Sequence, residues 1–389
     1  MKYHVLIFLS LLIQPMIFLG QPGRSAPAEM MQQKRMDSLL SLIKGSPDDS
    51  LKVQRLLLVS RLQFDPAKTR ADYAIQALSI AEKTGYKTGI MLANSEAGAV
   101  YQVLNNYPTA IQYYKKAILL SEEDNAGHAA SNFYPALLNL YFYLGDYPKA
   151  METISREKTI AEKTNDQKRI AHCENILGYI YFKQENFGES EQYYHRYISI
   201  ALALHDSLML AHAYGEIADV YTAEKKFPEA IDVLNRIIQI CDILPAKPGK
   251  LDTNFVNAWS PQYKGKAFYR LGKVYKLLGE YDSARLYALK ALDYSEKTSP
   301  PKYDIAGYYI SAGDIFNKIR SYSKAIEFLQ YGYALSREIQ HRENIRDAAG
   351  YLAQTYASLE KYDSAYYFFS IYTGLKDSIV NNETKMMIA

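Results

Sequence analysis

The sequence predicts an all-α solenoid built from about eight helix-turn-helix repeats, and three observations carry that prediction. A short motif of an aromatic residue, two variable residues and a small residue recurs, as in Tyr107-Pro-Thr-Ala110 and Tyr281-Asp-Ser-Ala284. Its small residues lie 40 or 41 residues apart, except for one interval of 54. No segment alternates polar and apolar residues over a useful length, so we expect no sheet. A fixed period near 40 residues is typical of stacked-repeat proteins.

The recurring motif places the turn of each repeat. Seven clear copies and a degenerate first copy at Arg70 put the turn anchors near residues 70, 110, 150, 190, 230, 284, 325 and 365. In the sixth repeat, Leu271, Tyr275 and Leu278 recur at helical spacing, which predicts an amphipathic helix before the turn. Gly279 then ends that helix. We therefore expect residues 46–379 to form one elongated domain of paired helices.

The N-terminal segment, residues 1–28, is predicted to be a signal peptide with a short linker. Lys2 precedes an apolar run that Pro15 interrupts, and the run is shorter than the roughly 20 residues of a membrane helix. Cleavage is expected after Gly20 or after Ala28, and an uncleaved N-terminal anchor is the alternative. No later segment approaches about 18 apolar residues. The mature chain is thus expected to have no membrane span and to be exported to the periplasm or cell envelope.

Three further segments lie outside the regular repeats. Residues 29–45 are predicted to form a leading helix that Gly45 closes, and residues 380–389 a C-terminal tail. The interval of 54 residues contains a proline-rich stretch, residues 245–261, that we expect to be an insertion loop. It carries Trp259, the only tryptophan in the chain. This side chain either covers an exposed face beside the loop or serves as a lid or partner contact.

Composition excludes several classes of function. The net charge is +3 with both signs interspersed, so neither nucleic acid nor a membrane surface is an expected partner. Motifs for phosphate loops, dinucleotides, zinc proteases and serine hydrolases are missing from the sequence, so we expect no enzyme activity and no cofactor. Cys173 and Cys241 are expected to be small buried residues. His172 and His212 lie 40 residues apart, but further metal ligands are not evident, so we expect no metal site.

A second recurring feature carries a resemblance to a known family. Small residues recur twelve positions before the turn anchors, at Gly98, Gly178, Ala218, Gly272, Gly313 and Ala353, and an aromatic residue follows three positions later. This pattern resembles the tetratricopeptide (TPR) repeat, and the long unit is similar to the MalT-like subclass. The resemblance implies antiparallel helix pairs stacked into a right-handed superhelix, whose concave groove binds a protein or peptide.

The ends of the repeat region carry a further resemblance. The segments 36–43 and 372–379 are similar to the entry and exit of the extracytoplasmic TPR region of bacterial sensor histidine kinases and transmembrane regulators. Two functions therefore stay open. One is a non-enzymatic envelope scaffold that binds a protein or peptide. The other is the ligand-sensing half of such a sensor or regulator, whose output module is not in this sequence. Neither resemblance indicates an oligomeric state.

The resemblance also implies which side chains line the groove. In the sixth repeat these are Lys266, Tyr269, Lys273 and Lys276, with Arg270 beside them and Trp259 as the covering residue; in other repeats they include Asn139, Tyr179, Asp219 and Asp314. A cluster of cations on one helix face favours an acidic peptide or a free carboxylate as the partner. The alternative is a solvated face on which Asp219 and Asp314 each pair with Lys273.

Overall fold

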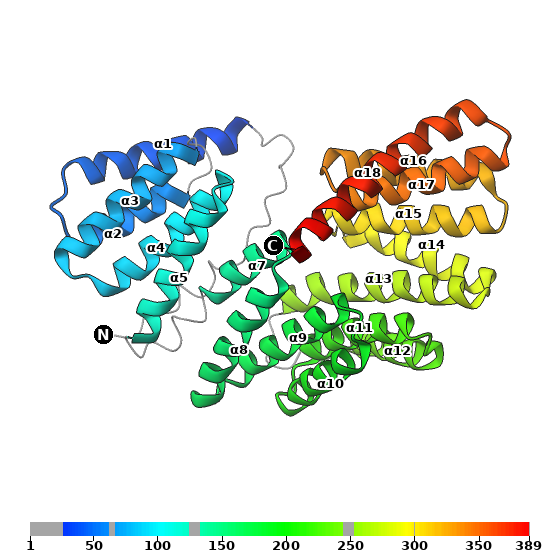
Figure 1. The fold of residues 1–389 in the computed structure, drawn as a ribbon, viewed down its shortest axis with the longest axis horizontal. Helices are drawn as coiled ribbons and strands as arrows, with labels where there is room; N and C mark the ends of the chain where they lie inside the picture. Colours follow the sequence, from blue (N-terminus) through cyan, green and yellow to red (C-terminus); the bar gives the residue numbers. More distant parts are fainter. Residues whose placement is uncertain (1–25, 62–66, 124–132, 244–252, 299, 389) are drawn as a thin grey trace. The chain divides into compact units, whose positions relative to one another are not determined.

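The computed structural model describes residues 26–61, 67–123, 133–243, 253–298 and 300–388, and within these ranges it contains seventeen helices and no strand (Figure 1). The chain divides into two compact units, Met1–Arg169 and Ile170–Ala389. Each unit is a series of consecutive helices that pack pairwise against their neighbours in sequence. The predicted all-α architecture of stacked helix pairs is therefore confirmed.

The first unit begins with the predicted leading helix, which starts slightly earlier than expected. Its helices are α1 (Ala26–Lys44), α2 (Ser50–Arg61), α3 (Ala67–Thr84), α4 (Lys87–Val103), α5 (Tyr107–Glu123), α7 (Tyr134–Leu144) and α8 (Tyr147–Lys163). Ile43 of α1 joins a buried cluster with Leu56 of α2 and Ala77 of α3. The leading helix thus covers the apolar face that the first repeat would otherwise expose.

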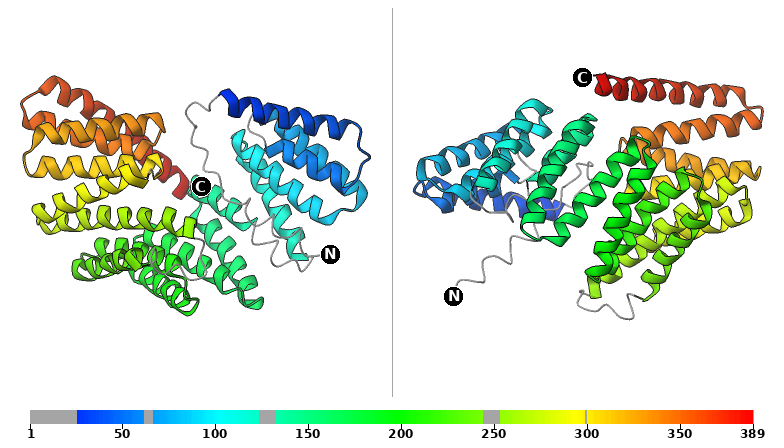
Figure 2. Two further views of the ribbon diagram at one scale, coloured as in Figure 1. Left: turned by 180° about the vertical axis from the view of Figure 1, so that it is seen from behind. Right: turned by 60° about the horizontal axis from the view of Figure 1, so that its bottom comes forward.

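The second unit contains most of α9 and all the helices that follow. They are α9 (Gln167–Lys183), α10 (Phe187–Ala203), α11 (Ser207–Ala223), α12 (Phe227–Ile243), α13 (Thr253–Leu278), α14 (Tyr281–Thr298), α15 (Lys302–Lys318), α16 (Tyr322–Glu338), α17 (Arg342–Ser358) and α18 (Tyr362–Ile388). Both views in Figure 2 show α13 to α18 as successive antiparallel helices. A buried cluster extends from α9 to α15 and includes Ile217, Leu234 and Leu271, all fully buried. A second buried cluster, with Leu329 and Leu352, lies between α15, α16 and α17.

The small residues of the repeat lie where the two helices of a pair approach most closely. A Cβ added to Gly272 would lie 3.4 Å from the carbonyl oxygen of Ala284 and 3.4 Å from the backbone nitrogen of Ala288. A Cβ at Gly178 would lie 2.8 Å from the ring of Tyr194. All eight turn anchors, including Arg70, are buried. The repeat register predicted from the sequence is therefore confirmed.

The first helix of a pair ends in a left-handed turn. Gly279 has a φ of 78°, and the backbone of Glu280 donates to the carbonyl of Tyr275 at 3.0 Å. Five other first helices close in the same way with a residue that carries a side chain, at Asn105, Glu185, Lys225, Arg320 and Glu360. Asn165, His205 and Gln340 adopt the same left-handed conformation after the second helices α8, α10 and α16. The hydrogen bonds of the turn, rather than glycine alone, therefore fix where these helices stop.

The unusual tyrosine content is largely structural. Four repeats contain a parallel ring stack between their two helices, formed by Tyr101 with Tyr113, Tyr181 with Tyr193, Tyr275 with Tyr287, and Tyr356 with Phe368. The ring centroids in the Tyr275 stack lie 5.4 Å apart with an interplanar angle of 1°. Such stacked pairs stabilise the helix contact beyond the area that they bury.

The predicted insertion loop at residues 245–261 is wrong for its second part. Helix α13 already begins at Thr253 and contains both Trp259 and Pro261, which makes it 26 residues long against 17 for α11. Ser260 is buried and donates a hydrogen bond to the carbonyl of Cys241 on α12 at 2.8 Å. This contact ties the added turns to the neighbouring helix, so the proline is accommodated inside the helix instead of ending it.

The segment predicted as a C-terminal tail, residues 380–389, continues α18 as far as Ile388. The sequence contains neither proline nor glycine after Gly374, so no residue there forces the helix to stop. Residues 1–25 of the predicted signal peptide lie outside the described residues, and Ala26 begins α1. None of the described helices is both long enough and apolar enough to cross a membrane.

Candidate partner-binding site

The second unit contains a cavity of about 550 Å³ whose wall comes mainly from the first helices of successive repeats. Its lining side chains are Ala211, His212, Glu216 and Asp219 of α11, Ile237 of α12, Trp259, Gln262, Tyr263, Lys266, Tyr269, Arg270 and Lys273 of α13, Tyr303, Asp304, Gly307 and Tyr308 of α15, and Asn344 of α17. Three basic and three acidic residues lie among them. The cavity, which we call the α13 cavity, is thus polar and aromatic, with balanced formal charge.

Six of the ten predicted groove residues meet in this wall: Asp219, Trp259, Lys266, Tyr269, Arg270 and Lys273. Lys276 and Asp314 do not line it but form an ion pair with each other at 2.6 Å. Tyr179 lies on α9, with the ammonium group of Lys183 5.5 Å from its ring centroid. Asn139 is exposed on α7 and belongs to the first unit.

Arg270 is held by two acidic residues of the preceding repeat. Its Nη2 lies 2.7 Å from Oδ2 of Asp219 and 3.4 Å from Oε1 of Glu216. A Cβ at Gly215 would lie 2.7 Å from Nη1 of Arg270, so the absence of a side chain there leaves room for the guanidinium group. Burial opposes the charged form of Arg270, but Asp219 and Glu216 outweigh it and raise its pKa. This cation is neutralised within the protein.

Lys266 is also paired. Its Nζ lies 3.2 Å from Oδ2 of Asp304 on α15, and the side chain of Asp304 is only 7% exposed. Burial raises the pKa of Asp304, while the charge of Lys266 acts in the opposite direction. A partly exposed lysine thus compensates a buried carboxylate, and neither charge is freely available to a ligand.

Lys273 is the exception. It has no ion pair with any residue that the structure describes, and its ammonium group lies 5.4 Å from the ring centroid of Tyr269. The expected pairing of Asp219 and Asp314 with Lys273 is wrong. Asp219 pairs instead with Arg270, one turn earlier on α13, and Asp314 with Lys276, one turn later. The positive charge that remains open to the α13 cavity is therefore confined to Lys273.

Aromatic rings form the rest of the wall. Trp259 and Tyr263 lie on consecutive turns of α13 with ring centroids 6.3 Å apart, so the tryptophan belongs to the cavity wall and not to a loop. His212 meets the ring of Tyr263 edge-on, and the hydroxyl of Tyr197 lies 3.4 Å from its Nδ1. Burial lowers the pKa of His212, and the charges of Arg270 and Lys266 lower it further against the opposing effect of Glu216.

The sequence reasoning missed the residues of the first helical turns. Asp304, Tyr303 and Asn344 lie at the start of α15 and α17, one turn before the positions that the groove pattern covers. The sequence did contain one clue to these residues, namely that partly buried cations need carboxylate partners. Lys266 and Arg270 lie in a stretch without acidic residues on their own helix, so their counter-charges had to come from neighbouring repeats.

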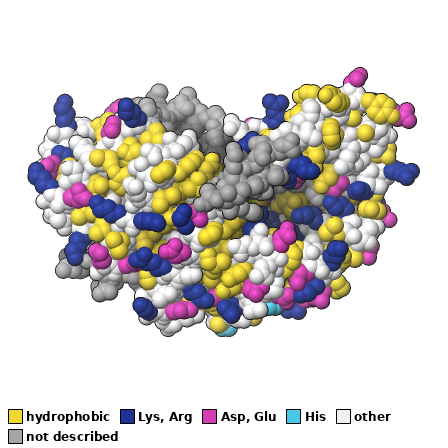
Figure 3. Space-filling view, in the orientation of Figure 1, with side chains coloured by type: hydrophobic (Ala, Val, Ile, Leu, Met, Phe, Trp, Pro, Cys, Tyr) yellow, Lys and Arg dark blue, Asp and Glu magenta, His cyan; other side chains and the backbone are white. Residues whose placement is uncertain are grey.

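Two other features bear on what the site can hold. Burial lowers the pKa of His172, and the charge of His212 lowers it further. The two histidines of adjacent repeats are therefore close enough to interact electrostatically. Across the described residues, no three histidine, cysteine or acidic side chains gather as a metal ion would require. Basic and acidic side chains are interspersed on the face that Figure 3 shows. The α13 cavity thus offers a ligand aromatic rings and one unpaired cation, Lys273.

Comparison with known proteins places these helices in context. A family model described as tetratricopeptide repeat matches residues 169–242, and another with the same description matches residues 265–298. These ranges include most of α9 and α12, all of α10, α11 and α14, and the second half of α13. No curated protein matches the sequence.

Several solved structures share the fold. Aspartyl phosphate phosphatase F from Bacillus subtilis has a TM-score of 0.61 at 13% identity, over 92% of this chain and 96% of that one. The apo quorum sensor NprR from B. thuringiensis has a TM-score of 0.58 at 15% identity, over 90% and 94%. A Rap protein complexed with Competence and Sporulation Factor has a TM-score of 0.57 at 17% identity, over 92% and 94%. At such identities these likenesses concern the fold alone.

Proposed function

Because this chain is a tetratricopeptide-repeat protein, we propose that it is a non-enzymatic scaffold that binds a peptide or protein segment in the α13 cavity. One observation carries the proposal: the cavity combines a wall of aromatic rings with a single open cation, Lys273. Rings supply apolar contact area, and one cation fixes the position of one anionic group. The partner is expected to place an acidic side chain or its C-terminal carboxylate at Lys273.

The state of the carboxylates supports binding over catalysis. Asp219 and Glu216 are engaged with Arg270, and Asp304 is engaged with Lys266. A carboxylate that is tied to a cation is poorly placed to accept or deliver a proton during a reaction. Two of the similar folds are described as complexes: a Rap protein with Competence and Sporulation Factor, and a Rap conjugation gene regulator with the Phr* peptide.

The test uses an array of short peptides with free C-terminal carboxylates, each printed beside its amidated counterpart. The wild-type protein should retain a subset of the carboxylate peptides, and Lys273→Glu should lose them. Lys318→Glu is the matched control, because Lys318 is an exposed lysine at the end of α15 and does not line the cavity. Binding should weaken with added salt, since the Debye length is about 8 Å at physiological ionic strength.

Two outcomes would contradict the proposal. Retention of the same peptides by Lys273→Glu would remove the α13 cavity as their binding site. Equal retention of the amidated peptides would remove the carboxylate preference.

We further propose that the protein works in the cell envelope, on the basis of its first 28 residues. A charged residue followed by a short apolar run supports export. Cell fractionation with N-terminal sequencing tests this proposal, and recovery of an intact Met1 in the cytoplasm would overturn it.

A sensing role is the second candidate. The segments at 36–43 and 372–379 support it, together with the fold shared with a structure described as a quorum sensor. The reading frame downstream of Ala389 distinguishes the two candidates. A membrane helix followed by an output module would favour the sensor, and an in-frame stop would favour the scaffold.

A further inference from the structure

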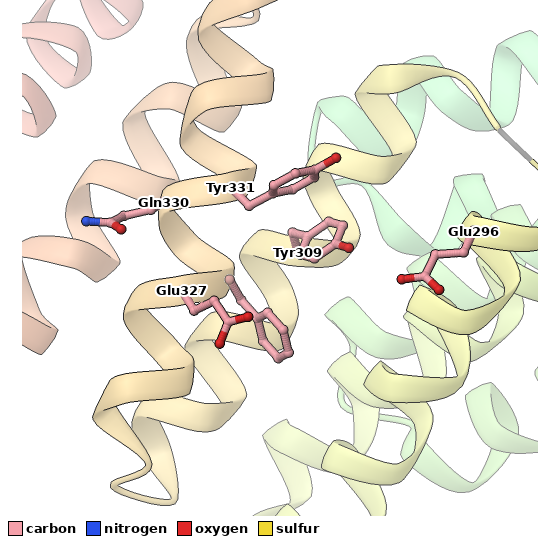
Figure 4. Close-up of a pocket in the computed structure, with 6 residues that line it drawn as sticks. Glu296, Tyr309, Glu327, Gln330 and Tyr331 are labelled. Atoms are coloured by element: carbon pink, nitrogen blue, oxygen red, sulfur yellow. The ribbon is translucent and has the colours of Figure 1, made fainter.

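A second hollow, of about 540 Å³, lies in the second unit between α14, α15 and α16. Its lining side chains are Glu296 of α14, Tyr309 of α15, and Glu327, Phe328, Gln330 and Tyr331 of α16. Figure 4 shows Glu296 extending from α14 toward the rings of Tyr309 and Tyr331. None of the six lining residues is basic. We call it the α16 hollow; it has no lining residue in common with the α13 cavity.

The rings of the α16 hollow are held in place by one another. The centroids of Tyr309 and Tyr331 lie 4.4 Å apart, with their planes tilted by 47°. Phe328 meets Tyr309 edge-on with ring centroids 5.8 Å apart, and the buried ring of Phe316 meets Phe328 edge-on at 5.3 Å. Tyr331 remains 54% exposed despite these contacts. The result is a fixed aromatic surface that is open to solvent.

The two carboxylates of the hollow lack counter-charges. Neither Glu296 nor Glu327 forms an ion pair with a basic side chain in the described part of the chain. Lys297, the neighbour of Glu296, pairs instead with Asp293 at 2.6 Å. The negative field reaches the rings: burial raises the pKa of Tyr309, and the charge of Glu296 raises it further.

The repeat position of Tyr331 carries a basic residue in most other repeats. Tyr331 stands six residues after its turn anchor, and the same position in the second to sixth repeats is basic: Lys116, Arg156, Arg196, Arg236 and Lys290. These cations contact the residues that correspond to the rim of the hollow. Arg236 lies 6.0 Å from the ring centroid of Tyr214, and Lys290 lies 5.4 Å from that of Phe268; both rings correspond in register to Tyr309.

The two acidic residues of the α16 hollow also have counterparts at the same positions of other repeats. Glu122 stands twelve residues after its anchor, as Glu296 does, and it pairs with Arg156 of the next repeat. Lys116 pairs in the same way with Glu82, at 3.2 Å. Asp232 stands two residues after its anchor, as Glu327 does, and pairs with Arg236 at 2.9 Å.

The α16 hollow therefore has the ring and the acids of this arrangement, but Tyr331 stands in place of the base. Where the third repeat meets the second, the corresponding set is complete, and Glu122 contacts both Tyr134 and Arg156. Without the base, the hollow is acidic and lined by rings, which is the environment that a cationic side chain occupies elsewhere in the same chain.

We propose that the α16 hollow binds an arginine side chain of a protein partner. The planar guanidinium group can lie against the rings of Tyr309 and Tyr331 while its N–H groups donate to Glu296 and Glu327. A compact, strongly hydrated ammonium group would use the rings less well, so arginine is preferred over lysine. This site is independent of the α13 cavity, and the two select partner groups of opposite charge.

The probe is a blocked pentapeptide with one arginine between glycines, and its comparison is the same peptide with citrulline, which has a similar shape but no charge. Each is titrated into the full chain while the tyrosine ring resonances are followed by NMR. The arginine peptide should shift the Tyr309 and Tyr331 signals, and the citrulline peptide should bind about tenfold more weakly or worse, since a charge-assisted contact is worth about that factor.

Three variants test the assignment. Tyr331→Arg should restore the internal cation and abolish peptide binding, while Tyr331→Phe should preserve the ring and the binding. Glu296→Gln should raise the Kd about tenfold. Lys273→Glu should leave this binding unchanged, which separates it from the α13 cavity. Failure of the arginine peptide to bind, equal binding of citrulline, or undiminished binding by Tyr331→Arg would each overturn the proposal.

Discussion

The α13 cavity and the α16 hollow are similar in size, at about 550 and 540 Å³, and both combine tyrosine rings with charged residues. They differ in how those charges are satisfied. In the α13 cavity, Arg270 and Lys266 meet carboxylates of neighbouring repeats, and Lys273 alone stays open. In the α16 hollow, the cation that this position provides in five other repeats is replaced by Tyr331.

The difference shows that formal charge is a poor guide to what a repeat surface binds. The first helix of the sixth repeat carries five cations, yet four of them, Lys264, Lys266, Arg270 and Lys276, are paired with carboxylates of the protein itself. The α16 hollow has only two acids, Glu296 of the sixth repeat and Glu327 of the seventh, and neither is paired with a base in the described part of the chain. A charge that is already paired has been compensated within the fold, so only an unpaired charge contributes much attraction to a partner.

The largest expected effect comes from Arg270. Arg270→Ala leaves Glu216 and Asp219 without their shared partner, and the free energy of unfolding should fall by about 2–3 kcal/mol. Glu327→Gln in the α16 hollow is the matched control: it removes an unpaired charge and should change stability by less than about 0.5 kcal/mol. Urea denaturation of both variants measures the contrast. Equal losses would mean that the two regions do not differ in pairing.

An intermediate effect is expected from His212. Its pKa lies below the ordinary value of 6.5, so the unfolded chain takes up a proton first, and stability is lost as the pH falls below 6.5 until the lowered pKa is reached. The loss stays below the limit of about 1.4 kcal/mol per pH unit, because the imidazole is 37% exposed and solvent screens the shift. Lys266, Arg270 and Glu216 are the charged groups around the ring.

Denaturation at pH 7.5 and pH 5.5 measures this effect. His212→Gln should lose less stability between the two values than the wild type. His205→Asn is the control, since it removes an exposed histidine from a left-handed turn position that asparagine tolerates. An unchanged pH dependence in His212→Gln would show that the charge state of the α13 cavity does not respond to acid.

The smallest effect should come from completing the α16 hollow. Tyr331→Arg supplies the cation that the second to sixth repeats contain, and the free energy of unfolding should rise by about 0.5–1 kcal/mol. Tyr331→Gln removes the ring without adding charge and should give no gain. A melting temperature of Tyr331→Arg at or below that of Tyr331→Gln would contradict the view that a cation is missing there.

Periodicity was sufficient to predict the repeats and much of the α13 cavity. The register that places Gly272 against Ala284 also places Lys266, Tyr269 and Lys273 on one face of α13, because all of them follow from one helical period. The burial of Cys173 and Cys241 is confirmed as well.

Two features were beyond the periodic pattern, for physical reasons. Which acid reaches which base depends on side-chain length and on contacts across repeats, so the partners of Asp219 and Asp314 were assigned to the wrong residue of α13. Pro261 lies inside α13 because contacts with α12 outweigh the loss of the backbone hydrogen bond that proline cannot donate. Local helix propensity does not include such contacts between helices, so it predicts a loop here.

The parallel ring stacks alternate along the chain. They occur in the second, fourth, sixth and eighth repeats, at Tyr101, Tyr181, Tyr275 and Tyr356. The third and fifth repeats have Thr153 and Val233 where the second ring of the stack would stand, and the seventh has an edge-on pair, Phe316 with Phe328. One ring stack thus recurs with every two repeats, so a variant shortened or extended by a pair of repeats would keep this alternation.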